Sequence, residues 1–513
     1  MNLFAQNFKR NDLISLSKKN FNKEVNINVY RNHSFEPIAS IINAFLNLSD
    51  LKANFYMSAY DDSLTFNITQ TVDLGIIFLD LTRYNNNVDE FITQKIQELK
   101  DITNSPVLTI LLGDTKLQKY RIEEILKPYI SSDLIIDEDS FMLSATKLSN
   151  KACIKLAQIL GLKIIPSILK PSLKVIICDL DNTLYDGVLG EDGIYGINLT
   201  QEHLKLQNQI LKLKNNGLML TIVSKNNECD VMEMFKKRDD FILKRDDFIL
   251  IKANWENKDK NIIDIGKYLN IGLDSILFID DNLAEIENVK YLGIKTLHAV
   301  NAKMTYDALM LYPCLQSDYI SQEDLLRNED MKANLKRESL KTLTQKEYFA
   351  KLDIHLQFSL NKESHLERIS QLLNKTNQFI ANYSRMNLSQ CANFIKNKDC
   401  VICSIGMRDI LSNSGIIAIV VAKRNDEILE ILDFCISCRA LGRKLEKIIL
   451  LKSLDILHTF LNTKKSVLYF KKGDRNLPFL NFLDEIKGNI FENKIEILDN
   501  VPNCEGLNIE SEI

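Results

Sequence analysis

The sequence lacks the surplus of basic residues that proteins binding nucleic acid or anionic membranes need. Its 64 Lys and Arg residues stand against 68 Asp and Glu residues, for a formal net charge of -4, and no basic cluster is interleaved with aromatic residues. It also lacks a long apolar run, because stretches such as "SGIIAIVVA" are far shorter than the roughly 20 residues of a membrane span. The first 20 residues are polar and charged, without the apolar centre of a signal peptide. We therefore expect a cytoplasmic protein with no membrane span and no nucleic-acid partner.

The ten cysteines do not form the pattern of a metal or disulfide framework. Two C-x-x-C pairs, Cys400/Cys403 and Cys435/Cys438, would offer zinc ligands. Each pair lies in a β-branched, strand-like run, where residues three apart point to opposite faces, and neither pair encloses a Gly-rich turn. Without a secretion signal, we expect free thiols.

The chain is too long, at 513 residues, for one ordinary core, so several domains are expected. From Val25 to about Ile165, apolar runs alternate with helical patterns, which predicts β-α units and a parallel sheet. The proline-containing stretch "PSILKPSLK" is predicted to be a linker, and a second α/β region begins at Val175. From about His355, a helix, antiparallel strands and a helix predict an α+β domain. We predict a multidomain α/β protein with domains at 1–168, 169–318 and 351–513 and a charged helical connector at 319–350.

The heptapeptide "KRDDFIL" occurs twice in tandem, from Lys237 to Leu250. Solenoid repeats are longer and need at least three copies. We interpret it as a local duplication on a passage from a helix to a strand.

Two carboxylates, Asp179 and Asp181, follow the apolar run "VIIC". Unpaired charges are costly in low dielectric, so these residues lie either in a solvated turn or at a metal or phosphate site. Ser224 follows a second predicted strand, Lys258 lies near the start of a helix, and the pair Asp280-Asp281 follows a third strand. Because parallel strands gather their carboxyl ends at one edge of a sheet, we expect these side chains to converge.

The converging set fits phosphoryl transfer. A carboxylate, Asp179, attacks phosphorus, while Asp181 protonates the leaving oxygen and then activates water. Ser224 and Lys258 supply a hydrogen bond and a positive charge to the phosphoryl oxygens. Further phosphate-binding candidates are Asn182, Thr183, Lys225 and Asn226. A hard cation, Mg²⁺, is expected on carboxylate oxygens, with Asp179, Asp181, Asp280 and Asp281 as candidate ligands.

The order D-x-D-N-T, Ser, Lys, Asp-Asp resembles the haloacid dehalogenase (HAD) superfamily. A response-regulator receiver has similar ingredients, but its phosphoacceptor is a lone aspartate in mid-domain, so the order here contradicts it. The short spacings leave no room for a large cap domain. "DGVLGEDG" is expected to form a flap over an open site that admits bulky substrates, including ones tethered to a protein.

Three stretches, "DLDNTLYDGVLGEDG", "NWENKDKNI" and "FIDDNLAEIENVK", resemble the FkbH-type branch of that superfamily. Such proteins carry a C-terminal domain similar to GNAT acetyltransferases, and "LLNKTNQF" and "SCRALGRKLE" resemble its most distinctive stretches. The resemblance implies a phosphatase joined to an acyltransferase-like domain, which passes a phosphoglyceryl-type acyl group from 1,3-bisphosphoglycerate to an acyl carrier protein. The alternatives are a phosphatase for another small phosphate ester whose C-terminal domain acylates a sugar or amino sugar, and a non-enzymatic scaffold.

The stretch "SCRALGRK" offers two C-terminal candidates. Arg439, Gly442 and Arg443 at a strand-to-helix junction are expected to bind a phosphate or pantetheine phosphate, although a helix start with solvated arginines is the simpler interpretation. The resemblance makes Cys438 a candidate acyl carrier, whereas alternation with the apolar residues before it would make it a buried structural cysteine.

The N-terminal domain resembles an SGNH-hydrolase fold but lacks its Gly-Asp-Ser start. The nearest segment is "YRNHSFE", which contains Ser34, and "LSNKACIKLA" has no histidine where a catalytic Asp/His pair would lie. We interpret this domain as a docking or structural domain, with Ser34 as a weak candidate nucleophile.

Overall fold

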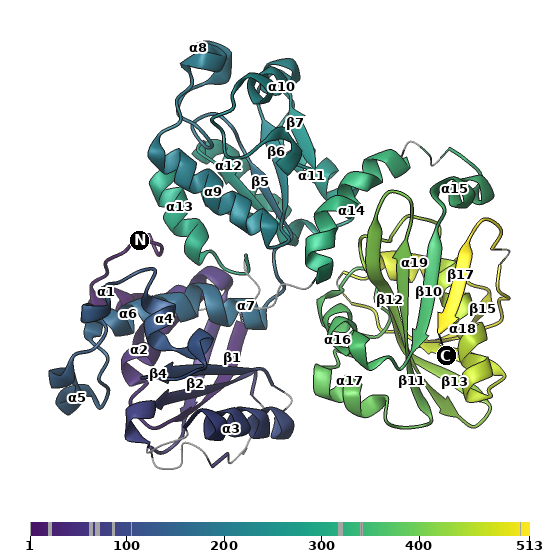
Figure 1. Ribbon diagram of the computed structural model, residues 1–513, viewed down its shortest axis with the longest axis horizontal. Coiled ribbons are helices and arrows are strands. Elements are labelled where there is room, and N and C mark those ends of the chain that lie inside the picture. The colour runs from purple at the N-terminus through teal and green to yellow at the C-terminus, as the bar shows by residue number, and fades with distance from the viewer. Residues whose placement is uncertain are drawn as a thin grey trace. The chain divides into compact units, whose positions relative to one another are not determined.

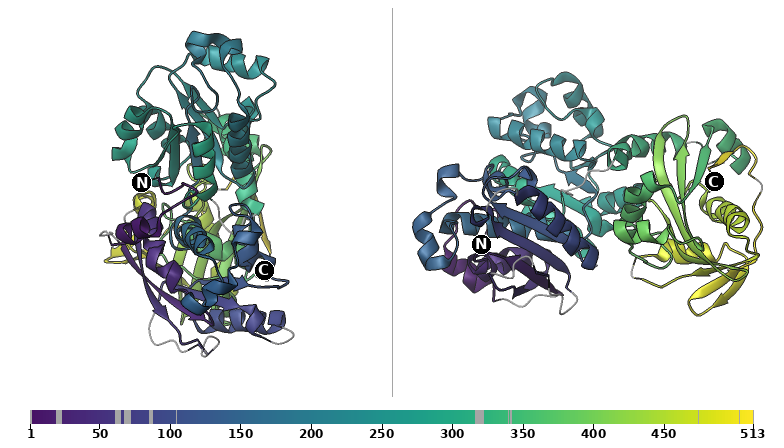
Figure 2. Two further views of the ribbon diagram at one scale, coloured as in Figure 1. Left: turned by 90° about the vertical axis from the view of Figure 1, so that its left-hand side faces the viewer. Right: turned by 60° about the horizontal axis from the view of Figure 1, so that its bottom comes forward.

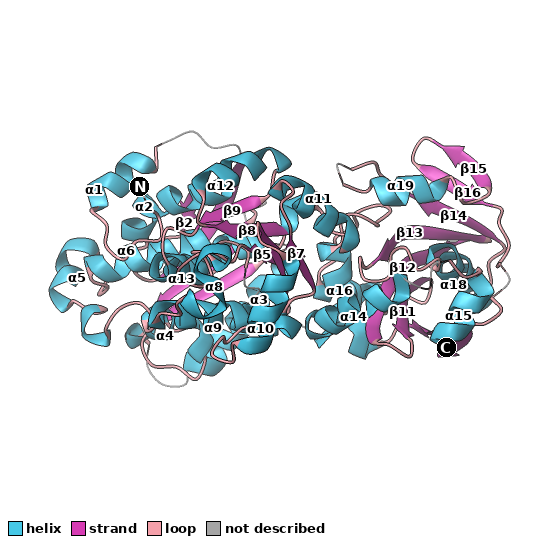
Figure 3. Ribbon diagram, turned by 90° about the horizontal axis from the view of Figure 1, so that it is seen from above, coloured by secondary structure: helices cyan, strands magenta, loops and turns pink. Residues whose placement is uncertain are grey.

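The computed structural model describes residues 2–18, 23–60, 65–66, 72–84, 88–103, 105–315, 322–338, 340, 342–473, 475–502 and 504–512. Its strands form three separate sheets, of four, five and eight strands (Figures 1 and 3). This confirms the multidomain α/β class. By its contacts the chain divides into two compact units, residues 1–172 with 306–318, and residues 173–305 with 319–513. The exact domain boundaries remain predictions.

The first unit is built on the predicted parallel sheet, in the order β2-β1-β3-β4. Its central strand β3 is buried along its whole length, as expected for a strand covered on both faces. Strand β2 was not predicted, because its sequence, "LKANFYM", is only partly buried and mixes polar with apolar residues. The strands are β1 (Lys23–Arg31), β2 (Leu51–Met57), β3 (Leu74–Asp80) and β4 (Val107–Leu112). The helices are α1 (Arg10–Leu16), α2 (Glu36–Leu46), α3 (Val88–Ile102), α4 (Ile122–Leu126), α5 (Glu138–Ser144), α6 (Asn150–Ile159) and α7 (Ile165–Leu169).

Part of the predicted linker is helical. Helices α6 and α7 are joined by a π-helical turn, Leu160–Ile164, into one continuous helix that contains Pro166 in its last turn. The linker prediction was therefore wrong up to Leu169. The segment Asn150–Leu169 is long and apolar enough to cross a membrane, but 72% of its most apolar window is buried inside the fold. It is packed as the core helix of a folded domain.

The second sheet is fully parallel, in the order β7-β6-β5-β8-β9. Strands β5, β6 and β8 are buried throughout, and β5 lies in the centre. The tandem heptapeptide runs from the last residue of α10 to the first residue of β7, which is the predicted passage from helix to strand. The strands are β5 (Val175–Cys178), β6 (Met219–Ser224), β7 (Leu250–Ala253), β8 (Ile276–Asp280) and β9 (Lys295–His298). The helices are α8 (Leu189–Gly196), α9 (Gln201–Asn215), α10 (Glu228–Lys237), α11 (Lys258–Tyr268) and α12 (Leu283–Val289), and α13 (Ala302–Leu311) begins in the second unit and ends in the first.

The third sheet is mixed, in the order β15-β16-β14-β13-β12-β11-β10-β17. Strands β10 to β13 are antiparallel, as predicted. Helix α18 packs with one face of this sheet and helices α16 and α17 with the other (Figures 1 and 2). The strands are β10 (His355–Leu360), β11 (Cys400–Arg408), β12 (Asn413–Asn425), β13 (Ile428–Ile436), β14 (Lys465–Tyr469), β15 (Gly488–Phe491), β16 (Lys494–Ile497) and β17 (Asn508–Glu512). The helices are α14 (Gln322–Glu338), α15 (Gln345–Leu352), α16 (Leu366–Lys375), α17 (Leu388–Phe394), α18 (Glu446–Leu461) and α19 (Leu477–Leu483).

Candidate active site

The polar residues at the ends of β5, β6 and β8 meet at the carboxyl edge of the second sheet. The register pairs Cys178 of β5 with Ile279 of β8, and the Asp179 N–H donates to the Ile279 carbonyl at 2.9 Å. Asp179 and Asp280, one residue further along each strand, are therefore brought side by side. Ser224 is the last residue of β6, on the other side of β5.

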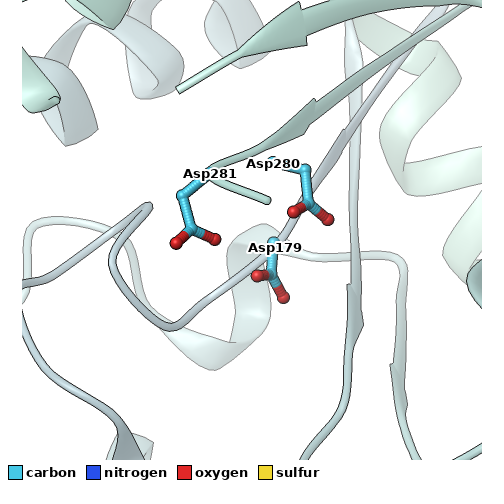
Figure 4. Close-up of side chains that lie close together, drawn as sticks. All are labelled: Asp179, Asp280 and Asp281. Atoms are coloured by element: carbon cyan, nitrogen blue, oxygen red, sulfur yellow. The ribbon is translucent and has the colours of Figure 1, made fainter. Parts of the chain in front are cut away.

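Three carboxylates form a cluster at this edge (Figure 4). One oxygen from each of Asp179, Asp280 and Asp281 lies within 4.8 Å of the others. Asp179 and Asp280 are buried and Asp281 is half-buried. Burial raises the pKa of Asp179 to about 6, an effect that Lys258 opposes and Asp280 reinforces. Burial also raises the pKa of Asp280 and of Asp281.

Lys258 supplies the positive charge within this cluster. It is the first residue of α11 and is 4% exposed. Its Nζ lies 3.1 Å from Asp179 Oδ1 and 2.6 Å from Asp280 Oδ2. Burial alone would lower the pKa of Lys258, but the two carboxylates outweigh it and raise the pKa.

The cluster fits a divalent cation by charge and by ligand type. With all groups ionised, three carboxylates and one ammonium leave two negative charges in a largely buried place. Asp179 Oδ1 is buried and faces Lys258 Nζ at 3.1 Å. Carboxylate oxygens are the ligands that Mg²⁺ prefers. Asp179, Asp280 and Asp281 are thus suited to hold Mg²⁺ together.

The carboxylate of Asp181 is not part of this cluster of three, and its role as a metal ligand stays a prediction. It accepts hydrogen bonds from the Tyr185 hydroxyl at 2.6 Å and the Leu189 N–H at 3.1 Å, and from Asn226 Nδ2 at 3.0 Å. Leu189 belongs to the flap, whereas Asn226 lies two residues after Ser224. Asn226 also donates to Ser224 Oγ at 3.1 Å, so its amide links the candidate acid to the candidate phosphate-binding serine.

Tyr185 was missed in the sequence. It is fully buried, and burial next to Asp181 raises the pKa of its hydroxyl. In the sequence, Tyr185 is marked only by its position four residues after Asp181, in a segment that turns back on itself. No general spacing rule identifies a tyrosine at that position as a partner of the aspartate.

Two of the other predicted phosphate ligands are engaged with the protein itself. Asn182 has a left-handed backbone, with φ 51°, and its Oδ1 accepts the Gly187 N–H at 3.1 Å. Lys225 forms an ion pair with Glu285. Thr183 is buried, and its hydroxyl has no hydrogen-bond partner among the described residues.

A short flap follows Tyr185, as predicted. Helix α8 is broken at Gly193, whose φ of 68° and ψ of 175° are not helical. Asp186 and Asn198 join the two stems of the flap through paired backbone hydrogen bonds of 2.9 and 2.8 Å. The flap is therefore a closed loop whose first helical residue, Leu189, contacts Asp181.

In the C-terminal domain, two of the predicted phosphate-binding residues, Arg443 and Gly442, are hydrogen-bonded to carboxylates of the chain itself. Arg443 is 4% exposed, and its NH2 donates to Asp330 Oδ1 of α14 at 3.0 Å. The Gly442 N–H donates to Glu446 Oε1 at 2.6 Å. Helix α18 begins at Glu446, after a turn in which Gly442 has φ 77°, and not at the glycine as predicted. Arg439 is buried as well, so the alternative of solvated arginines is wrong.

Cys438 lies in the turn after β13 and does not continue the alternation of that strand. It is partly exposed and packs against a hydrophobic cluster that includes Ile271 and Met331. Its C-x-x-C partner Cys435 is fully buried, and burial raises the pKa of that thiol. All ten cysteines are free, as predicted.

Ser34 of the N-terminal domain follows β1, and its hydroxyl donates to Glu36 Oε2 at 2.7 Å. The neighbouring His33 is buried and bonds to Thr146 Oγ1 at 3.0 Å. Among the described residues, no histidine is hydrogen-bonded to Ser34, and the role of this domain stays a prediction.

No family model and no curated protein matches the chain. Among solved structures, it is similar to the N-terminal part of a Bacteroides fragilis protein containing a phosphatase domain complexed with Mg. That pair has 21% identity and a TM-score of 0.47, over 60% of this chain and 100% of the other. A HAD family enzyme from Bacteroides thetaiotaomicron, in complex with magnesium and inorganic phosphate, has 15% identity and a TM-score of 0.18, over 25% and 93%. A GNAT-family acetyltransferase from Streptococcus pneumoniae has 11% identity and a TM-score of 0.21, over 28% and 96%. Because every score is below 0.5, the function rests on the side-chain geometry.

Proposed function

We propose that this chain is a Mg²⁺-dependent phosphatase of the HAD type, joined to an acyltransferase-like domain and acting on a small phosphorylated metabolite. The observation that carries the proposal is the cluster at the carboxyl edge of the second sheet. There a buried carboxylate, Asp179, lies between Lys258, Asp280 and Ser224. A carboxylate that must attack an anion needs such positive charge beside it.

In the proposed reaction, a carboxylate oxygen of Asp179 attacks phosphorus, and the bond from phosphorus to the ester oxygen breaks. Asp181 gives its proton to that oxygen. Water then attacks the aspartyl-phosphate, Asp181 accepts a proton from the water, and inorganic phosphate leaves. Ser224 and Lys258 donate to the phosphoryl oxygens throughout. Held by Asp179, Asp280 and Asp281, Mg²⁺ would offset the repulsion between the carboxylates and the phosphoryl group.

We further propose that the acyl phosphate of 1,3-bisphosphoglycerate is the source of an acyl group for Cys438. The thiolate would attack the carbonyl carbon, the bond to the phosphate oxygen would break, and the resulting thioester would pass to the thiol of an acyl carrier protein. The partial exposure of Cys438 supports this choice over the fully buried Cys435. The phosphatase site would remove the remaining ester phosphate.

The phosphatase proposal is tested by Asp179→Asn in the full chain, which keeps the shape but removes the nucleophile. Release of phosphate from small esters should fall by at least about a thousandfold, as expected when a covalent nucleophile is lost. A chelator should abolish the activity of the wild type, and added Mg²⁺ should restore that activity. Asp264→Asn, at an exposed position on α11, is the matched control and should retain full activity. Undiminished turnover by Asp179→Asn would refute the proposal.

A further inference from the structure

The two copies of the heptapeptide "KRDDFIL" have the same sequence but different surroundings. The first copy follows α10, which lies beside the flap helix α8 (Figure 1). The second copy leads into β7. Equivalent residues in the two copies therefore allow a comparison in which the local sequence is held constant.

In the first copy, Arg238 is bonded to the second stem of the flap. Its NH1 donates to the Ile194 carbonyl at 2.7 Å and to the Ile197 carbonyl at 3.1 Å. Its Nε and NH2 each donate to the Asp240 carboxylate at 2.8 Å. The planar guanidinium uses its donors in fixed directions, so the fork to Asp240 orients the remaining nitrogen at the flap.

The same copy also contacts the residue that holds the candidate acid. The Arg238 guanidinium carbon lies 5.5 Å from the centre of the Phe241 ring. Phe241 is buried, and its ring centre lies 5.9 Å from that of Tyr185, in an edge-to-face arrangement. Tyr185 in turn donates to Asp181. Arg238 thus reaches Asp181 by two routes, through the backbone of the flap to the Leu189 N–H and through two packed rings to the Tyr185 hydroxyl.

In the second copy, the hydrogen bond of the equivalent arginine within the described part of the chain is local. Arg245 NH1 donates to the Phe248 carbonyl at 3.2 Å, within the same copy. Asp247 pairs with Lys214 of α9 at 2.8 Å, and Phe248 packs on Phe235. None of these contacts involves the flap.

We infer that Arg238 is a positioning residue that fastens the flap and thereby holds the Leu189 N–H and the Tyr185 hydroxyl on Asp181. The fastening itself follows from the contacts above, whereas its effect on turnover rests on the proposed phosphatase function. Loss of Arg238 should release the second stem of the flap, since its two carbonyls would lose the donor that bridges them. Asp181 would then lose the orientation needed to protonate a leaving oxygen.

The fastening is tested by hydrogen–deuterium exchange of the full chain, comparing Arg238→Gln with its matched control, Arg245→Gln. The amides of the flap peptide (residues 186–198) should exchange at least tenfold faster in Arg238→Gln and within twofold of the wild type in Arg245→Gln. The β5 peptide serves as the internal reference for an intact fold. If Arg238→Gln does not fold, Arg238→Lys replaces it, because an ammonium cannot bridge two carbonyls and a carboxylate in the same geometry. Wild-type exchange of the flap in the Arg238 variant, or equal acceleration by both variants, would overturn the inference.

The effect on Asp181 is tested by the dependence of turnover on the leaving group. An alkyl phosphate needs its leaving oxygen protonated, whereas p-nitrophenyl phosphate releases a stable anion without help. In Arg238→Gln and in Tyr185→Phe, kcat should fall at least tenfold more for the alkyl ester than for the aryl ester, with KM little changed. An equal loss on both esters would refute the route through Asp181. If the wild type hydrolyses neither ester, the proposed function fails, while the exchange experiment still decides whether Arg238 fastens the flap.

Discussion

Replacing Lys258 by methionine should destabilise the domain built on the second sheet, most strongly when Mg²⁺ is absent. Methionine keeps the unbranched shape of the side chain but removes the charge. In the wild type, the Lys258 side chain is 5% exposed, and the side chains of its partners Asp179 and Asp280 are 7% and 0% exposed. Without the ammonium, three ionised carboxylates would share this place with no cation.

The magnitude follows from the burial of both partners. Removing one member of a buried ion pair costs about 3–5 kcal/mol, because the other charge is left uncompensated. Burial already raises the pKa of Asp179 to about 6, so this carboxyl can take up a proton near neutral pH and relieve part of the strain. We therefore expect a loss near the lower end, about 3 kcal/mol, which corresponds to an increase of about a hundredfold in the exchange of globally protected amides.

The measurement is hydrogen exchange of the β5 peptide in the full chain, in EDTA and in excess Mg²⁺. Lys225→Met is the matched control, since Lys225 is 43% exposed in its pair with Glu285 and such pairs contribute less than about 1 kcal/mol. Mg²⁺ at a hundred times its Kd should slow exchange in the wild type by an amount equivalent to about 2.7 kcal/mol, and at least as much in Lys258→Met. Unchanged exchange of Lys258→Met in EDTA would show that the lysine does not compensate the cluster. The absence of any Mg²⁺ effect would remove the cluster as a metal site.

Three further predictions concern the other domains. Burial lowers the pKa of His33 to about 3, whereas the unfolded chain takes up a proton below its ordinary value of about 6.5. The stability that neutral His33 contributes above pH 6.5 is therefore lost as the pH falls towards 3, and the loss is about 2 kcal/mol at pH 5. His33→Gln should abolish this pH dependence, measured as the hydrogen exchange of the β1 peptide at each pH. Incubation with 1,3-bisphosphoglycerate should add a hydroxylamine-labile glyceryl or phosphoglyceryl mass to the peptide containing Cys438, and Cys438→Ser should lose it; an adduct on Cys435 would remove Cys438 from the mechanism. Asp330→Asn should destabilise the C-terminal domain by about 3 kcal/mol, because Arg443 loses a buried counter-charge, and wild-type urea unfolding would contradict this.

Much of the candidate active site could be predicted because its residues follow a local rule. Asp179, Ser224 and Asp280 come at or just after the ends of buried strands, and in a parallel sheet those ends share one edge. The apolar runs are readable in the sequence, so the convergence followed without knowledge of any contact. The short strand β9 was missed, because "KTLH" has no run of apolar residues and lies at the edge of the sheet.

The direction of a side chain could not be predicted in the same way. Asp179 and Asp181 are two residues apart, yet one joins the carboxylate cluster and the other is hydrogen-bonded to Tyr185 and Leu189. That difference depends on Tyr185 and on the backbone of Leu189, which reach Asp181 only once the flap has folded back. Similarly, Arg443 and Asp330 are 113 residues apart, and no spacing in the sequence relates a connector helix to a turn in the next domain.

The two predicted anion-binding places differ in their balance of charge, and this balance decides which of them requires a ligand. In the C-terminal domain, Arg337 pairs with Asp330 at 3.1 Å and Asp409 at 2.8 Å, and Arg443 pairs with Asp330 at 3.0 Å. Within these pairs two arginines and two aspartates balance, so a phosphate binding to Arg443 would have to displace a buried carboxylate, whereas the buried Arg439 lies outside these pairs. At the phosphatase site, three carboxylates face one ammonium. A cation is needed there before an anionic substrate can approach, and this order of events is the one that metal-dependent phosphoryl transfer requires.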